Sequence, residues 1–182
     1  DHRSVVHNFK ELMERISFIQ TEFDSPALIE EFVEGREIYV SVLGGAKLEA
    51  LPLVEWDFSR VPEGTPKFAS AEAKWDTESS RYKDAPEVLV HDLPEHVVTA
   101  LQEAAIEAFR ALRLRDYGRI DMRIRPRRDA ESAADGARPS LVDDWEFYLI
   151  EVNPNAHLAT DSELPMAAKA HGLTYQPVSY TH

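Results

Sequence analysis

The sequence predicts an α+β fold, in which a mainly antiparallel β-sheet is flanked by helices. Residues 36–43 alternate apolar and polar side chains, the period of a strand with one buried face. Two glycines at 44–45 permit a tight turn into the apolar stretch 47–56, so these segments predict an antiparallel hairpin. In 4–23 and 93–112, apolar residues recur every three or four positions, which is typical of amphipathic helices.

Length and composition fit one domain spanning residues 1–182. With 43% hydrophobic and 29% charged residues, the chain can bury a core and is expected to be soluble and cytoplasmic. No apolar stretch approaches the roughly 20 residues that span a bilayer, so no membrane partner is expected. The net charge of −13 disfavours nucleic acid, whose phosphates require clustered cations. The absence of cysteine excludes disulfides, thiolate zinc sites and thiol nucleophiles.

The first half of the chain reads as a helix followed by three strands. The helix is expected from Ser4 to about Phe23, and a short strand at 27–33. The hairpin strands 36–43 and 47–56 come next. From 57 to 92 prolines are frequent and apolar pairs are few, so this segment predicts a long surface loop.

The second half begins with a well-marked helix. Asp92 provides an N-cap acid, Pro94 a first-turn proline and Glu95 the third residue after the cap, and the helix should end near Arg115. Its predicted buried stripe is Val97, Leu101, Ala104, Ala105, Ala108, Phe109 and Leu112. Two strands, 117–125 and 147–153, flank a polar segment, 126–144, interpreted as a mobile hairpin insertion. A last helix should run over 162–171 and end at Gly172.

The chemistry-bearing residues lie on those two strands. If the strands are neighbours, Asp121, Glu151 and Asn153 can project from one sheet face, and carboxylate and amide oxygens are the ligands that Mg²⁺ selects. Arg119 shares that face and could hold a phosphate. Taken singly, each residue is more often just solvated. Glu151, however, interrupts an apolar strand and is expected to be buried, which costs several kcal/mol unless the acid is paired or metal-bound.

Three ordered segments, 29–37, 117–121 and 150–154, resemble motifs of the ATP-grasp superfamily. The likeness is strongest to D-alanine:D-alanine ligase-like carboxylate-amine ligases and extends through 164–169. It implies the C-terminal subdomain of the grasp fold. It also implies an ATP-dependent ligase that forms a C–N bond through an acylphosphate, with Mg²⁺ or Mn²⁺ as metal. The implied substrates are small-molecule carboxylates and amines, such as an amino acid or small peptide.

The resemblance also implies a role for each matching residue. The positions that match the adenine-binding stretch are Glu30, Glu31, Phe32 and Val33. Glu37 matches the acid that binds the ribose hydroxyls, and Ile150 matches the residue that packs under the adenine. Those matching the metal ligands are Asp121, Glu151 and Asn153. Arg119 matches the arginine that stabilises the transferring phosphoryl group, and Lys74, in the 57–92 loop, matches a phosphate-contacting lysine. Ser162 falls where the family binds the substrate carboxylate.

The chain also departs from the family. The family's substrate-binding domain and first grasp subdomain, with two lysines and a glycine-rich loop, do not precede Asp1. We therefore expect the C-terminal fragment of a longer ligase, inactive alone, whose full-length form is compatible with a homodimer. Residues 155–158 replace a glycine-containing turn and Glu163 follows Ser162, which leaves the substrate open. Two alternatives are a non-catalytic nucleotide-binding or interaction module that retains the grasp fold, and an acidic α+β domain without a ligand.

Overall fold

A computed structural model divides the chain into two compact units. The first comprises 1–34 and 58–85, and the second 35–57 and 86–182. The described residues are 2–45, 47–61, 67, 85–127, 140–142 and 144–174. No helix in that part of the chain is long and apolar enough to cross a membrane. The expectation of a single domain stays a prediction.

The first unit contains a helix that begins later than predicted. Its elements are the short 3₁₀-helices η1 (His2–Ser4) and η2 (Phe58–Arg60) and the helix α1 (Phe9–Phe23). The helix starts at Phe9 because Asn8 caps it: the Asn8 side chain accepts a hydrogen bond from the Glu11 backbone N–H at 3.0 Å. The Glu11 carboxylate in turn accepts from the His7 backbone N–H at 2.8 Å. This reciprocal capping satisfies amide groups that the first helical turn leaves without partners.

The prediction of a strand at 27–33 is wrong, because the whole segment is irregular. A run of apolar residues becomes a strand only where another strand accepts its backbone hydrogen bonds. No described strand pairs with this segment. Its large apolar residues are accordingly exposed, with Leu28 at 81% and Ile29 at 59%.

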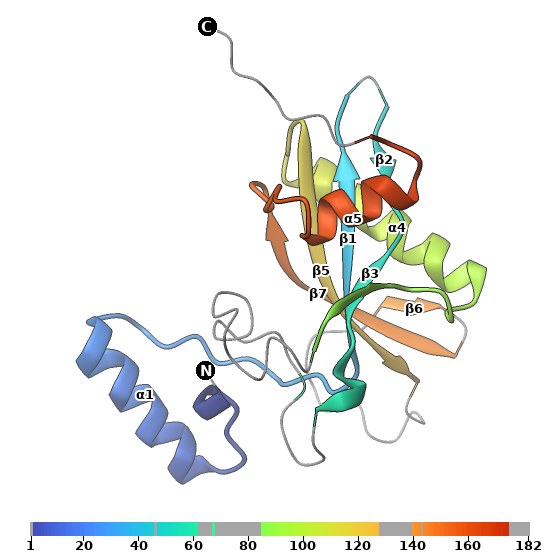
Figure 1. Cartoon of the computed structure of the whole chain (residues 1–182). Helices are drawn as coiled ribbons and strands as arrows, with labels where there is room; N and C mark the ends of the chain where they lie inside the picture. Colours follow the sequence, from blue (N-terminus) through green and yellow to red (C-terminus); the bar gives the residue numbers. More distant parts are fainter. Residues whose placement is uncertain are drawn as a thin grey trace, which may run out of the picture. The chain divides into compact units, whose positions relative to one another are not determined.

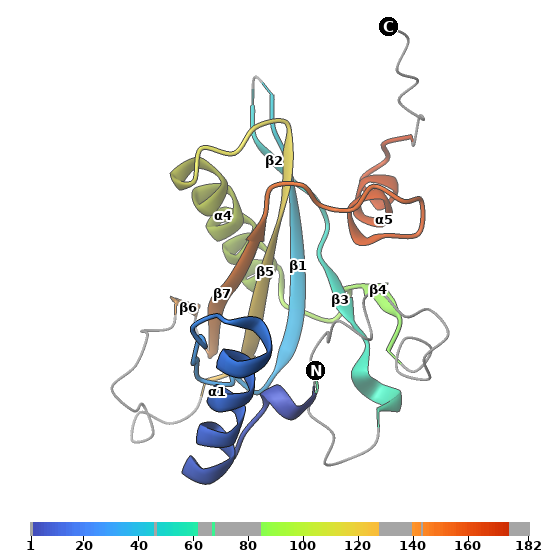
Figure 2. The same cartoon turned by 90° about the vertical axis from the view of Figure 1, so that its left-hand side faces the viewer.

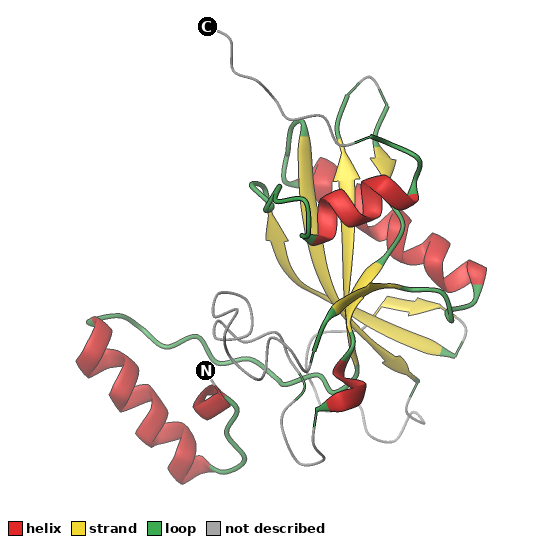
Figure 3. Ribbon diagram, viewed as in Figure 1, coloured by secondary structure: helices red, strands yellow, loops and turns green. Residues whose placement is uncertain are grey.

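The second unit is built on an antiparallel sheet, as the sequence predicts (Figures 1 and 3). The order along the sheet is β4-β3-β1-β5-β7-β6, and β2 also pairs with β1. The strands are β1 (Arg36–Leu43), β2 (Glu49–Ala50), β3 (Val54–Trp56), β4 (Glu87–Leu89), β5 (Tyr117–Pro126), β6 (Ser140–Val142) and β7 (Trp145–Asn153). Two helices, α4 (Glu95–Ala111) and α5 (Glu163–Ala170), complete the unit. The predicted last helix is thus confirmed to within a residue at each end.

The structure subdivides two segments that the sequence predicts as continuous elements. The hairpin after Gly45 is confirmed, but its returning arm divides into β2 and β3, both paired with β1. The predicted 57–92 loop contains η2 and the strand β4, which pairs with β3. Three residues are too few to show a period of two, so only tertiary pairing defines β4. In the predicted 126–144 insertion, β6 pairs with β7, and the centre of that insertion lies outside the described residues.

The apolar faces of the central strands pack against α4. The core cluster joins Ile38, Val40 and Val42 of β1, Ile120, Met122 and Ile124 of β5, and Val97, Leu101, Ala105 and Phe109 of α4. Burying each large side chain stabilises the fold by roughly 1.5–3 kcal/mol. Four residues of the expected stripe are buried, and Ala104 and Ala108 are partly buried against the core. Leu112 is instead 58% exposed, because α4 ends at Ala111 rather than near Arg115. Asp92 does not cap the helix, because its carboxylate accepts from Arg36 at 2.7 Å.

The opposite face of the sheet is also covered. Figure 2 shows α4 and α5 on opposite sides of the sheet, and α5 contacts β1, β3 and β4. Alternation predicts one buried face, yet the polar face holds Tyr39, Ser41, Arg119, Asp121 and Arg123, all buried. A polar face that is buried must satisfy its groups internally.

We expect Gly35→Ala to destabilise the second unit by roughly 3 kcal/mol. Gly35 has φ +144°, and a Cβ there would lie 2.2 Å from the Ile124 carbonyl oxygen. Urea denaturation measures the change, and Gly172→Ala is the matched control. Gly172 also has positive φ, +90°, but nothing lies within 4 Å of an added Cβ, so its loss should be nearer 1 kcal/mol. Equal losses for the two variants would contradict the close approach at Gly35.

Candidate functional site

The register of three strands gathers the polar residues predicted from the sequence. Asp121 lies opposite Glu151 of β7 on one side and Tyr39 of β1 on the other, and Arg119 lies opposite Asn153. Directly opposed residues of antiparallel strands share a face, with Cβ atoms about 4.5–5.5 Å apart. The Asn153 Nδ2 donates to Asp121 Oδ2 at 3.2 Å. The structure therefore brings Asp121, Glu151 and Asn153 onto one face, as expected.

A β-bulge alters the predicted alternation of β7. Asp121 pairs with Glu151, but the next residue of β5 pairs two positions earlier on β7, so Ile150 is the extra residue. Tyr148, opposite Arg123, consequently shares the face of Glu151, whereas strict alternation along 147–153 would put these two residues on opposite faces. Glu151 is exposed rather than buried, which corrects the expectation from its apolar neighbours. Ile150, predicted to pack under adenine, is 52% exposed.

Three hydrogen bonds fix the Arg119 side chain on this face. Its Nε and Nη2 donate to the two carboxylate oxygens of Asp121 at 2.7 and 2.8 Å, and its Nη1 donates to Glu163 Oε1 at 2.6 Å. The guanidinium also lies over the Tyr39 ring, 4.4 Å from its centroid. Burial disfavours the cation, but the Asp121 and Glu163 carboxylates outweigh burial and raise the pKa of Arg119 above its ordinary value. The group is a permanent, oriented cation.

Glu37 takes part in a second set of contacts on the same face. Its carboxylate accepts from the Tyr39 hydroxyl at 2.8 Å and from Arg123 Nη1 at 3.0 Å. Burial, together with the Glu37 and Asp121 carboxylates, raises the pKa of Tyr39 far above its ordinary value, so the phenol stays protonated and donates. Glu37, which resembles the ribose-binding acid, is thus already hydrogen-bonded to Tyr39 and Arg123.

An acidic pair that the sequence did not predict lies at the Arg119 end of this face. Glu163 is 7% exposed at the start of α5 and is hydrogen-bonded to Glu87 of β4. Burial and the neighbouring Glu163 carboxylate raise the pKa of Glu87 to about 8, although Arg119 opposes the shift. Glu87 is therefore protonated at neutral pH and can share its proton with Glu163.

This shift predicts that stability falls as pH rises. Between the ordinary pKa of 4.5 and about 8, folded Glu87 binds more proton than unfolded Glu87, so deprotonation costs stability across that window. We expect a loss of up to about 3 kcal/mol from pH 5 to pH 8, measured by urea denaturation. Glu87→Gln should flatten this slope, whereas Glu103→Gln, an exposed change on α4, should keep it. A slope unaltered by Glu87→Gln would refute the assignment.

The remaining predicted residues have different surroundings. Glu30, Glu31 and Phe32 are exposed and Val33 is buried; all four belong to the first unit. Lys74 lies outside the described residues.

Ser162, predicted to bind the substrate carboxylate, is engaged within its own loop. Its Oγ is a donor to the carbonyl oxygens of His157 and Ala159, at 2.9 and 2.7 Å. A hydroxyl has one proton, so these carbonyls compete with any substrate for it.

The donor set of the shared face fits a hard divalent cation. Two carboxylates, Asp121 and Glu151, and the amide of Asn153 offer oxygens, which suit Mg²⁺. Asp121 already binds Arg119, so its oxygens would be shared between metal and guanidinium. Among the described residues no group of three or more His, Cys, Asp or Glu side chains could hold a metal ion, and this set has only two acids.

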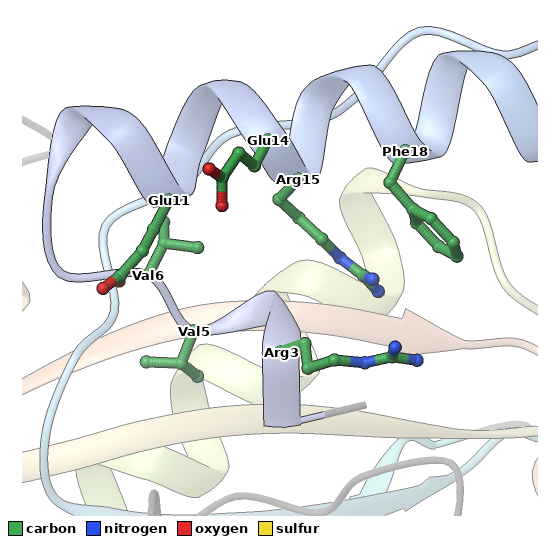
Figure 4. A pocket seen from close by; sticks show the side chains of 7 residues that line it. All are labelled: Arg3, Val5, Val6, Glu11, Glu14, Arg15 and Phe18. Atoms are coloured by element: carbon green, nitrogen blue, oxygen red, sulfur yellow. The ribbon is translucent and has the colours of Figure 1, made fainter.

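A cavity of about 380 Å³ belongs to the first unit (Figure 4). It is lined by Arg3, Val5, Val6, Glu11, Glu14, Arg15 and Phe18. The guanidinium carbons of Arg3 and Arg15 lie 5.7 and 4.7 Å from the centroid of the Phe18 ring. None of the residues predicted to bind nucleotide, metal or substrate lines it.

Comparisons with known proteins identify relatives for most of the chain. A family model described as D-ala D-ala ligase C-terminus matches residues 3–131. The D-alanine–D-alanine ligase of Bordetella petrii is 32% identical over 156 residues, which cover 85% of this chain and 39% of that protein. The corresponding ligase of Desulfotalea psychrophila is 30% identical over 172 residues, 94% of this chain and 45% of that protein.

A solved structure shares the fold. The D-alanine–D-alanine ligase of Bacillus anthracis, complexed with ATP, superposes with a TM-score of 0.60 at 22% sequence identity. The match covers 92% of this chain and 43% of that one. At this identity, the likeness shows the fold alone.

Sheet, flanking helices and relatives together define the C-terminal portion of an ATP-grasp fold. The chain belongs to the D-ala D-ala ligase C-terminal family. The family and the fold class expected from the sequence are thereby confirmed. The chain spans 39% and 45% of the length of the Bordetella and Desulfotalea ligases.

Proposed function

We propose that this chain is the C-terminal part of an ATP-dependent carboxylate-amine ligase. Such an enzyme activates a carboxylate as an acylphosphate, and an amine then attacks to form a C–N bond. Membership of a ligase family supports this proposal. The observation that carries it is the shared sheet face, where a buried, oriented arginine lies among two carboxylates and an amide.

The residues of this face have different roles in the proposed reaction. Asp121, Glu151 and Asn153 would hold Mg²⁺ or Mn²⁺, which when bound would neutralise phosphate charge. Arg119 would stabilise charge on the transferring phosphoryl group by electrostatics and positioning, without forming a covalent intermediate. Its pairing with Asp121 fixes where that positive charge lies.

The nucleotide roles are likewise proposals. The backbone of 30–33 and the first acid of that stretch would meet adenine, and Glu37 would bind ribose hydroxyls. The role proposed for Ile150 is to pack under adenine. Both Glu37 oxygens already accept one hydrogen bond, but a carboxylate has about four acceptor sites, so ribose hydroxyls could still bind. Lys74 would contact phosphate and Ser162 the substrate.

Residues outside this chain would complete the enzyme. We propose a cytoplasmic protein, compatible with a homodimer, in which a preceding segment supplies further phosphate contacts and residues 1–182 act as one domain. The substrates would be an amino acid or small peptide and an amine. The 182-residue chain alone is expected to be inactive.

Release of ADP by the full-length parent protein tests the proposal. The parent is incubated with ATP, Mg²⁺ and a panel of amino acids and small peptides. We expect ADP and phosphate only when a substrate is present. Nucleotide binding without turnover across the panel would favour a non-catalytic module, and failure to bind nucleotide would overturn both.

A further inference from the structure

Arg119 is held from two directions by two separate elements. Asp121, two residues along the same strand, accepts from Nε and Nη2, and Glu163, the first residue of α5, accepts from Nη1. The side chains of Arg119 and Glu163 are both only 9% exposed. The contact therefore joins α5 to β5 through a buried ion pair.

Each anchor restricts a different motion. The Asp121 fork is planar and bidentate, which defines the plane of the guanidinium. The contact with Glu163 is made by Nη1, on the other side of the group, and therefore opposes rotation about the side-chain bonds that carry the guanidinium. The guanidinium also lies over the Tyr39 ring, with the Cζ atom 4.4 Å from the ring centroid.

The contacts with Asp121 and Glu163 do not use every N–H donor of the guanidinium. An arginine has five N–H donors, and within the described residues three are used by Asp121 and Glu163. The other two, one on Nη1 and one on Nη2, are not used in the hydrogen bonds to Asp121 and Glu163. Such guanidinium N–H groups are suited to donate to phosphate or carboxylate oxygens.

We propose that Glu163 is a positioning residue that, together with Asp121, holds the Arg119 guanidinium where its remaining N–H donors can bind the phosphate of the nucleotide. This inference rests on the proposed function and deepens it by assigning a role to an acid outside the predicted site. Glu87 supports the arrangement, because a protonated carboxyl beside Glu163 stabilises the Glu163 carboxylate by a hydrogen bond.

Kinetics of Glu163 variants in the full-length parent protein test the proposal. We expect Glu163→Ala to lower kcat by about 10- to 100-fold with little change in KM for ATP, because misplacing a charge by about 1 Å costs that much. Glu163→Gln keeps an oxygen acceptor and should recover most of kcat. A folded Glu163→Ala protein with wild-type kcat would overturn the proposal. So would a Glu163→Gln protein no better than Glu163→Ala.

A second measurement remains decisive if the parent shows no turnover. NMR of arginine side chains reports rotation about the guanidinium bonds independently of catalysis. We expect the Arg119 Nε–H signal to show restricted rotation and slow solvent exchange in the wild type, and faster rotation in Glu163→Gln and more so in Glu163→Ala. Glu103→Gln on α4 should match the wild type. An Arg119 signal unchanged in both Glu163 variants would refute the anchor, whereas missing turnover alone would refute only the ligase proposal.

Discussion

Replacing Arg119 by leucine should lower the free energy of unfolding by about 3–5 kcal/mol. The change removes the guanidinium that pairs with Asp121 and Glu163, which are 3% and 7% exposed. Removing one partner of a buried ion pair is costly because the charges left behind have already lost their hydration. Urea denaturation at pH 7 measures the loss.

A matched control separates this effect from a general loss of positive charge. Arg110 is exposed in the last turn of α4, so Arg110→Leu should change stability by no more than about 0.5 kcal/mol. A loss below about 1 kcal/mol at pH 7 would contradict the buried pairing.

Changing Glu151 to glutamine should greatly lower activity without affecting the fold. Glu151 is exposed, so its replacement by an isosteric amide should leave the free energy of unfolding within about 0.5 kcal/mol of the wild type. In the full-length parent protein, we expect turnover to fall by about 100-fold or more, because a ligand of the proposed cation loses its charge. ADP release at saturating ATP measures the effect.

The dependence on added cation distinguishes a metal ligand from other roles. Raising Mg²⁺ should partly restore Glu151→Gln, since a weakened site fills at higher concentration. Glu103→Gln, another exposed acid-to-amide change, should keep wild-type turnover and wild-type Mg²⁺ dependence. Full activity in Glu151→Gln at low Mg²⁺ would remove Glu151 from the site.

The parts of the fold that were predictable are those whose local pattern agrees with their packing. The alternation in 36–43 matches β1 because both neighbouring strands fix its register. The segment 27–33 has a similar apolar content but no described strand beside it, so composition alone misled. Leu112 fits the helical period of α4 but follows its last residue, and Arg113, with φ +55°, turns the chain away.

Part of the candidate site could be predicted from the expectation that two strands are neighbours in the sheet. Alternation on β5 and β7 sufficed to place Asp121 and Asn153 on one face, because the register near the strand ends is regular. The bulge at Ile150 could not be predicted, since no turn residue marks it in the sequence. The Glu87–Glu163 pair could not be predicted either, because it joins a three-residue strand to a distant helix and depends on tertiary packing.

The most direct test of the proposed cation site is anomalous scattering from Mn²⁺ in crystals of the full-length parent protein grown with ATP. We expect a manganese peak about 2 Å from oxygens of Asp121, Glu151 and Asn153, beside the phosphates. A manganese ion held by other groups, with these three side chains directed elsewhere, would contradict the proposed site.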